Sequence, residues 1–150
     1  MLIPTTDILT RARLSNHLFT SDISKLYNRL RLHQDHYEFS LFLYNEDLHP
    51  DVPPKIHVLT RAWYGVISSG NQSAVAIDKL TKLYGSLFPQ ATSVLTSSTY
   101  VDDMVDGSDS LETRENKIND VSALLAKGSL PLKYIVRSGF PVPEEARVGR

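Results

Sequence analysis

Residues 99–107, "TYVDDMVDG", place two adjacent aspartates, Asp102 and Asp103, inside an apolar and β-branched run. Short strand-like segments stand on either side, "SSTYV" at 97–101 and "MVDGS" at 104–108. This pattern predicts a β-hairpin with the aspartate pair at its tip. Adjacent aspartates are common in ordinary turns, but these flanks are too apolar for an ordinary exposed tip. The meaning of the pair therefore depends on the rest of the chain.

The segments around this hairpin alternate between strand and helix patterns. In chain order we predict a short helix over 5–17, a strand over 18–23 running into a helix over 24–32, strands over 37–45 and 55–65 joined by a proline-rich turn at 46–54, a helix over 68–88, the hairpin, a helix over 109–128, a strand over 130–139 and a loose tail over 140–150.

Capping signals set the expected ends of the two longer helices. Ser69 or Asn71 is expected to cap the 68–88 helix, and Pro89 to stop it. Asp109 is the expected N-cap of the 109–128 helix, with Glu112 as its capping-box partner and Leu111, Ile118, Val121 and Leu125 on its apolar stripe. Gly128 is its expected C′ residue.

This order of elements predicts an α+β fold, an antiparallel sheet with helices packed on one face, similar to a split βαβ or ferredoxin-like arrangement. A length of 150 residues with 41% hydrophobic residues is enough for one core and one domain. The 16 basic and 17 acidic residues nearly cancel, so the total charge favours no nucleic-acid or membrane partner.

The chain has no cysteine, which excludes disulfides and thiolate metal sites and is typical of a reducing compartment. No stretch approaches the roughly 18 apolar residues of a membrane span, and the first residues lack the pattern of a signal peptide. We therefore expect a soluble, intracellular protein that is not exported.

A third carboxylate stands at a matching place in the predicted sheet. Asp22 ends the 18–23 strand, and a strand end beside a hairpin tip would bring its carboxylate toward Asp102 and Asp103. Converging carboxylates repel one another unless a cation lies among them. Magnesium binds through one or two carboxylates together with substrate phosphates, and two such ions catalyse in-line phosphoryl displacement. The residues therefore predict metal-assisted phosphoryl transfer.

Four motifs in order resemble those of reverse transcriptases. "TYVDDMVDG" resembles the Tyr-x-Asp-Asp motif, and "LFTSDISKLYNRLRL" resembles the motif in which an aspartate ends the first strand and an aromatic follows five residues later. "RAWYGVISSGNQSAV" is similar to the next motif, an aromatic-glycine pair before small hydroxyl residues, and "LLAKGSLPLKYIVRSG" to the last. The match is most like the Pao/Bel-type LTR retrotransposon polymerases and runs over about residues 7–139.

The resemblance implies an RNA-directed DNA polymerase, with residues 1–139 as its palm and the fingers and thumb largely absent. It implies two Mg²⁺ ions, or Mn²⁺ in their place, held by Asp22 and Asp102 with Asp103 supporting them. It implies as partners an RNA or DNA template with primer, and deoxynucleoside triphosphates. Gly70 and Asn71 replace the proline and aromatic that usually follow the two serines in the family.

Three further residues take roles from the same resemblance. Tyr27 matches the aromatic gate under the incoming sugar, where a bulky ring leaves no room for a 2′-hydroxyl. Gly65 matches a point where the backbone approaches template or nucleotide, and Tyr100 would lie beside the primer terminus. Taken singly, a core aromatic and a turn glycine are the commoner explanations for Tyr27 and Gly65.

Two other functional classes stay open at this point. The chain could be an inactive, truncated retroelement product, or a ferredoxin-like binding module whose aspartates form an ordinary turn. The pair His33 and His36 lacks a third ligand for zinc, and "GVISSGNQS" is neither a serine-hydrolase elbow nor a P-loop. Basic residues such as Lys133 are expected to be solvated surface charges.

Overall fold

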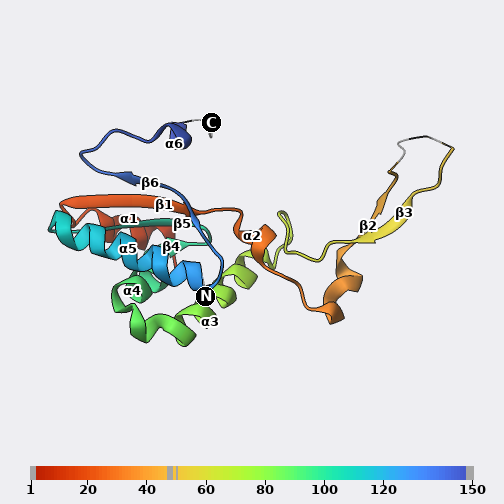
Figure 1. Ribbon diagram of the computed structural model, residues 1–150, viewed down its shortest axis with the longest axis horizontal. Coiled ribbons are helices and arrows are strands. Elements are labelled where there is room, and N and C mark those ends of the chain that lie inside the picture. Colours follow the sequence, from red (N-terminus) through yellow and green to blue (C-terminus); the bar gives the residue numbers. More distant parts are fainter. Residues whose placement is uncertain (1–2, 47–48, 50, 148–150) are drawn as a thin grey trace.

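The computed structural model describes residues 3–46, 49 and 51–147 and shows an α+β protein (Figure 1). A four-stranded antiparallel sheet with its helices forms the body, and a two-stranded hairpin extends away from it. The class expected from the sequence, an antiparallel sheet with helices packed on it, is therefore confirmed.

The strands of the body lie in an order that differs from their order in the chain. Across the sheet they are β4 (Thr99–Tyr100), β5 (Asp103–Ser108), β1 (His17–Ile23) and β6 (Leu132–Arg137), and all neighbours are antiparallel. Along the central strand β1, Phe19, Ser21 and Ile23 are buried while the residues between them are half-buried. This alternation places Asp22 on the face opposite the main core.

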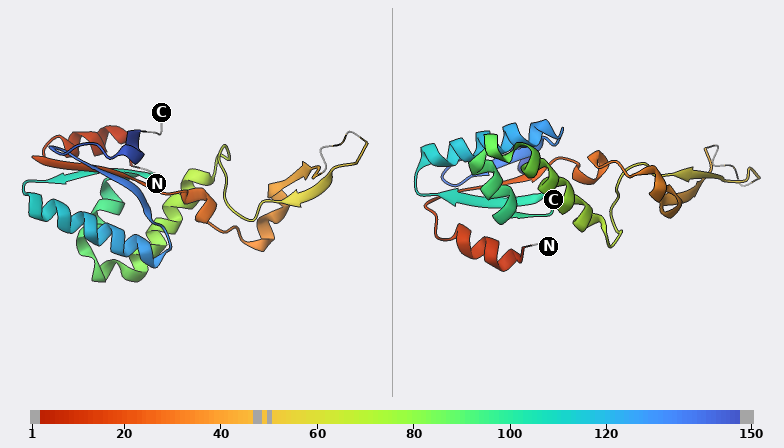
Figure 2. Two further views of the ribbon diagram at one scale, coloured as in Figure 1. Left: turned by 45° about the horizontal axis from the view of Figure 1, so that its top comes forward. Right: turned by 90° about the horizontal axis from the view of Figure 1, so that it is seen from below.

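Helices cover both faces of the sheet (Figure 2). On one face lie α3 (Ser69–Tyr84), a 3₁₀ turn η2 (Gly85–Leu87), α4 (Pro89–Ser97) and α5 (Leu111–Lys127). The core between them and the sheet includes Phe19, Ile23, Ile77, Val94, Leu95, Met104, Ile118, Val121, Leu124 and Leu125. The expectation of helices on one face alone is wrong, because α1 (Thr5–Ala12) packs on the other face and buries Ile8 and Ala12.

Helix α4 is an element that the sequence prediction lacked. Pro89 does not merely stop the preceding helix but stands in the first turn of α4, where a proline costs nothing because that amide has no intrahelical acceptor. The short apolar set of Ala91, Val94 and Leu95 has helical spacing and is fully buried. Helix α3 begins after Ser68 with no side-chain cap, so the expected caps at Ser69 and Asn71 are wrong.

Helix α5 is confirmed, with different ends. Its N-cap is Ser110 instead of Asp109, and the Ser110 hydroxyl accepts a 3.1 Å hydrogen bond from the Thr113 amide. Leu111, expected on the apolar stripe, is 47% exposed because it lies before the first turn that reaches the sheet. At the other end Ser129, with φ 56°, takes the left-handed conformation expected of Gly128.

The hairpin consists of β2 (Leu41–Tyr44) and β3 (Lys55–Val58), preceded by a 3₁₀ helix η1 (Gln34–Ser40). Both strands are shorter than the predicted 37–45 and 55–65, and the turn predicted at 46–54 includes residues 47–48 and 50, which lie outside the described residues. Most apolar side chains of the hairpin are exposed, among them Leu41, Leu43, Tyr44, Ile56 and Val58, and so is Phe39 of η1. The short α2 (Leu26–Arg29) leads from β1 toward it.

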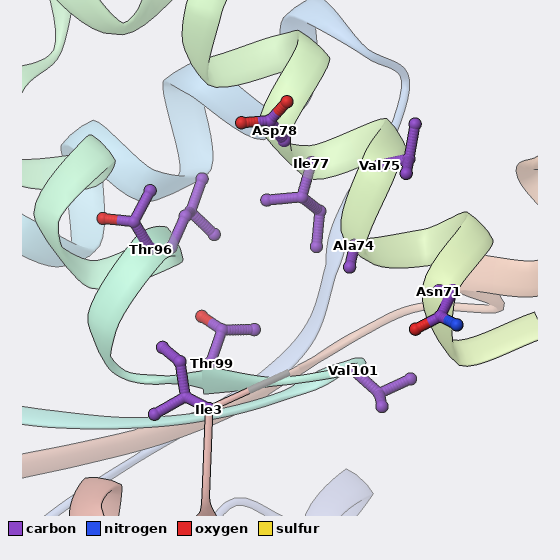
Figure 3. A pocket seen from close by; sticks show the side chains of 10 residues that line it. Ile3, Asn71, Ala74, Val75, Ile77, Asp78, Thr96, Thr99 and Val101 are labelled. Carbon is purple, nitrogen blue, oxygen red and sulfur yellow. The ribbon is translucent and has the colours of Figure 1, made fainter. Parts of the chain in front are cut away.

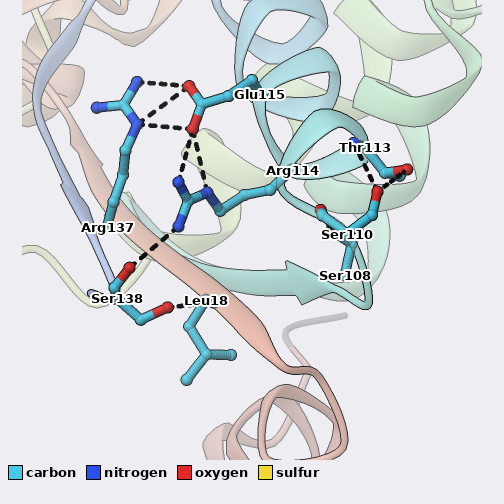
Figure 4. Close-up of polar contacts among 8 residues, drawn as sticks. All are labelled: Leu18, Ser108, Ser110, Thr113, Arg114, Glu115, Arg137 and Ser138. Atoms are coloured by element: carbon cyan, nitrogen blue, oxygen red, sulfur yellow. Dashed lines mark hydrogen bonds and ion pairs between the residues drawn. The ribbon is translucent and has the colours of Figure 1, made fainter. Parts of the chain in front are cut away.

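A buried arginine joins α5 to the end of β6 (Figure 4). Arg114, 1% exposed, lies 2.9 Å from a carboxylate oxygen of Glu115 and donates to the carbonyl of Ser138 at 3.2 Å. Arg137 donates from two nitrogens to the same carboxylate. These hydrogen bonds lower the pKa of Glu115, with the Arg137 bonds as the largest cause.

The segment expected to be a loose tail contains a short helix, α6 (Glu144–Arg147), that contacts β6. The remaining tail residues, 148–150, lie outside the described part of the chain. Among the helices of the described residues, none combines the length and the apolar character needed to cross a bilayer.

Candidate functional site

The antiparallel pairing of β1 with β5 brings the predicted carboxylates together. Asp22 and Asp103 are direct partners across this pair, and the Cα atoms of such partners are about 4.5–5.5 Å apart. Both side chains therefore project from the same face of the sheet. Asp102 precedes β5, and its carbonyl accepts a 3.0 Å hydrogen bond from the Ile23 amide beside Asp22.

The hairpin tip is a two-residue turn of Val101 and Asp102, since Tyr100 pairs with Asp103. Asp103 is thus the first residue of β5, whereas the sequence predicted both aspartates at the tip. Val101 has φ 59°, a left-handed conformation that is costly for a β-branched residue. Glycine or asparagine is the usual choice at such a position. A strained turn held by its surroundings is a feature that clusters at functional sites.

The surroundings of Asp22 and Asp103 raise the pKa of both carboxyl groups. Burial raises the pKa of Asp22, and the negative charge of Asp102 raises it further. The pKa of Asp103 is raised by the same two causes in the same order. Lys133 opposes both shifts with its positive charge. The cluster therefore carries negative charge that a further cation would stabilise.

Asp22 has one carboxylate oxygen in contact with a cation and one without a partner. Its Oδ2 lies 3.7 Å from the Lys133 ammonium. Its Oδ1 is buried and accepts no hydrogen bond within the described part of the chain. An unpaired buried carboxylate oxygen is costly, and a cation ligated at that atom would remove the cost. The donor set thus fits a hard divalent ion, which prefers carboxylate oxygens.

No group of three or more histidine, cysteine, aspartate or glutamate side chains in the described residues forms a complete metal-binding cluster. Magnesium sites that act on phosphates need only one or two carboxylates, since water and phosphate oxygens supply the remaining ligands. His33 and His36, which the sequence already left without a third ligand for zinc, are separate from this site. The rings of His33 and His36 have centroids 6.4 Å apart, and His33 Nδ1 instead accepts a 3.4 Å hydrogen bond from the Asp35 amide.

Aromatic rings stand beside the carboxylates. Tyr27 of α2 contacts Tyr64 edge to face, with ring centroids 4.9 Å apart. The pKa of Tyr27 is raised first by burial and then by the charge of Asp102, with smaller contributions from Tyr64 and Tyr100. Tyr27, Tyr64 and Tyr100, from three separate segments of the chain, therefore lie near the hairpin tip. Tyr64 and Tyr100 are 64% and 42% exposed, so both present ring surface to a ligand.

Gly65 follows Tyr64 in a turn with φ 86°, a conformation that side-chain-bearing residues rarely adopt. A Cβ built there would meet no atom within 4 Å. Backbone conformation therefore accounts for this glycine, since no other described residue lies close to the Cβ position. The turn leads into α3, where the buried Ser69 hydroxyl donates to the Trp63 carbonyl at 2.7 Å.

A groove of about 800 Å³ lies on the other side of the hairpin tip, between α3, α4 and β4 (Figure 3). Ile77 and Thr99 point into it, and Asn71 and Val101 line one end. Val101 is half-buried here. The tip thus has an apolar side facing the groove and an acidic side facing Asp22.

Two residues of the site were missed by sequence reasoning. Lys133 was expected to be a solvated charge, whereas it pairs with Asp22, because an irregularity in the β1–β6 pairing places it opposite that residue. Tyr64 was noted only as part of a motif, and its contact with Tyr27 depends on how α2 and the 61–68 segment meet. Neither the Lys133–Asp22 contact nor the Tyr64–Tyr27 contact can be predicted from the local sequence pattern, because each joins residues that are far apart in the chain.

Comparison with models of known protein families gives no match, and comparison with curated proteins gives no significant relative.

Proposed function

We propose that this chain is the palm of an RNA-directed DNA polymerase of a retroelement, in which Asp22, Asp102 and Asp103 hold divalent cations. The observation that carries the proposal is the cross-strand pairing of Asp22 with Asp103 beside a strained hairpin tip that bears Asp102. The resemblance of four motifs in order supports it. The sheet order β4-β5-β1-β6 is compatible with a ferredoxin-like palm.

The chemistry would be nucleotidyl transfer, which depends mainly on positioning and electrostatic stabilisation. Mg²⁺ bound at Asp22 and Asp102 would lower the pKa of the primer hydroxyl and neutralise the leaving pyrophosphate. Asp103 adds negative charge beside Asp22 and so strengthens cation binding. The pairing of β1 with β5 places Asp22 directly opposite Asp103 before any substrate arrives.

The tyrosines would serve the nucleotide. The ring of Tyr27 is held by its edge-to-face contact with Tyr64, and it lies within the electrostatic influence of Asp102. A ring held firmly beside a metal-bound triphosphate can exclude a 2′-hydroxyl, because the extra oxygen would overlap it. The exposed rings of Tyr64 and Tyr100 offer surfaces on which bases or sugars stack.

Primer extension on an RNA template tests this proposal. With Mg²⁺ and deoxynucleoside triphosphates, the wild-type chain is expected to extend the primer, and Asp102→Asn to lose at least about 100-fold in rate, as expected when a transition-state charge contact is removed. Asp109→Asn, an exposed carboxylate outside the site, is the matched control and is expected to retain activity.

Three outcomes separate the candidate functions. Extension lost only in Asp102→Asn supports the polymerase. Equal extension by Asp102→Asn and wild type would show that the activity comes from a contaminant and contradicts the role given to Asp102. No extension by any form favours the inactive retroelement product or the ferredoxin-like binding module over an active polymerase.

A further inference from the structure

Strand β6 has an irregularity directly opposite Asp22. Ser21 pairs with Ile135, but Ile23 pairs with Leu132. One residue of β1, Asp22, therefore faces two residues of β6, Lys133 and Tyr134. This is the two-against-one count of a β-bulge, a feature that re-aims side chains and is frequent beside functional sites.

The bulge is fixed by hydrogen bonds from residues that flank Asp22. The buried Ser21 hydroxyl donates to the carbonyl of Tyr134, which the bulge would otherwise leave without its ladder partner. The Ser24 amide donates to the carbonyl of Pro131 at 2.9 Å. Lys133 thus lies between Tyr134 of β6 and Pro131, which directly precedes the strand, and both of these carbonyls are hydrogen-bonded. Its approach to Asp22 is a product of backbone geometry.

The Lys133 ammonium lies beside the acidic cluster. Its ammonium lies 3.7 Å from Oδ2 of Asp22 and 5.4 Å from the centre of the Tyr134 ring. It lowers the pKa of both Asp22 and Asp103 against the effects of burial and of Asp102. Its side chain is 49% exposed, so the ammonium can swing into solvent without unfolding the strand.

We propose that Lys133 is a built-in counter-ion that occupies Oδ2 of Asp22 in the metal-free protein and competes there with the incoming divalent cation. The inference rests on the proposed function, because it concerns the same carboxylates. Lys133 is a positioning residue: it keeps the carboxylates together before the cation binds and must give up its ion pair when the cation arrives. A cation near Asp22 is repelled by the ammonium, so the lysine weakens cation affinity.

Titration of the full chain with Mn²⁺ by isothermal calorimetry tests this competition. Lys133→Met removes the charge and is expected to bind Mn²⁺ about tenfold more tightly, the order of effect of one half-exposed unit charge within 4 Å. Lys133→Gln is a second neutral variant and is expected to behave in the same way. Lys133→Arg keeps the charge and is expected to stay near the wild-type affinity.

Lys79→Met is the matched control. It makes the same change in net charge on an exposed position of α3, and Lys79 is not among the groups that shift the pKa of Asp22 or Asp103. Its Mn²⁺ affinity is expected to stay within about twofold of wild type. Tighter binding is a gain that a damaged fold cannot produce, so partial unfolding of a Lys133 variant cannot imitate the expected result.

The outcomes distinguish this inference from the proposed function. If wild type binds Mn²⁺ and both neutral variants bind equally or more weakly, the carboxylate site stands and the competition is refuted. If none of the proteins binds Mn²⁺, the proposed metal site fails and the role of Lys133 fails with it. If Lys79→Met increases the Mn²⁺ affinity as much as Lys133→Met does, the effect comes from the change in net charge alone. That result would overturn the inference.

Discussion

At the scale of single residues, the hairpin tip shows a conflict between sequence and conformation. Val101 adopts φ 59°, although β-branched residues resist the left-handed region. The hydrogen bond from the Ile23 amide to Asp102 and the strand pair on either side hold this conformation in place. The tip therefore stores strain next to the carboxylates.

Replacing Val101 with asparagine is expected to relieve that strain. Asparagine tolerates the left-handed region, so Val101→Asn should raise the free energy of unfolding by about 1 kcal/mol. The control Val136→Asn, in the regular part of β6, is expected to lower it. Urea unfolding of both variants measures the difference. A loss of stability in Val101→Asn as large as in Val136→Asn would mean that the turn carries no strain.

Asp103 gives a second prediction, based on pH. Its pKa is higher in the folded state than the ordinary aspartate value of 3.8, so the folded protein binds this proton more tightly than the unfolded chain. Stability from this group is therefore greatest below about pH 4 and falls as pH rises through the folded pKa. Asp103→Asn should raise the melting temperature at pH 7 by about 2 °C.

That gain should disappear at acid pH. Near pH 3.5 the wild-type carboxyl is mostly protonated in both states, and the two proteins should melt at the same temperature. Thermal unfolding across the pH range provides the comparison. A destabilised Asp103→Asn at pH 7 would contradict the effects of burial and of the Asp102 charge, which together raise the pKa of Asp103.

At the scale of secondary-structure elements, Glu115 connects α5 to β6. Its carboxylate accepts hydrogen bonds from Arg137 and Arg114, and these hold its folded-state pKa below the ordinary glutamate value of 4.5. Because the folded pKa is depressed, the stabilisation is present above the unfolded pKa and is lost as pH falls through the folded one.

Glu115→Gln should therefore destabilise the protein at neutral pH. We expect a loss of about 1 kcal/mol at pH 7, modest because the carboxylate is partly solvated, and a smaller loss at pH 3, because protonation of Glu115 removes the stabilisation. Glu112→Gln, in the first turn of the same helix and in no ion pair with another described residue, should change the free energy of unfolding little. Denaturant unfolding at pH 7 and pH 3 separates the loss of the Glu115 ion pairs from a general destabilisation of α5. A general destabilisation of the helix would be equally large at pH 3.

The elements differ in how well their sequence predicts them. Strand β1 and helix α5 were predictable because their apolar residues recur at one clear period. Helix α4 was not, since "PQATSVLTS" is rich in β-branched and hydroxyl residues that disfavour helices locally. Burial of Ala91, Val94 and Leu95 against the core overrides that preference.

At the scale of the whole molecule, the site depends on long-range register. The sequence suggested that Asp22 and the hairpin would meet, because a strand end and a hairpin tip were both predicted in one sheet. It could not predict that Asp22 faces Asp103 directly, since the register of β1 against β5 depends on packing along both strands. The position of Lys133 opposite Asp22 was even harder to predict from the sequence, because it depends on a one-residue bulge in the β1–β6 pairing.

The most direct test of the account is whether a paramagnetic cation binds at the three carboxylates. In ¹⁵N-resolved NMR spectra, sub-stoichiometric Mn²⁺ is expected to broaden the amide signals of Asp22, Ile23, Asp102 and Asp103 first, while signals from the β2–β3 hairpin stay sharp. The double variant Asp22→Asn, Asp102→Asn should abolish this selectivity. Uniform broadening, or broadening of the same amides in the double variant, would contradict a divalent-cation site at the hairpin tip.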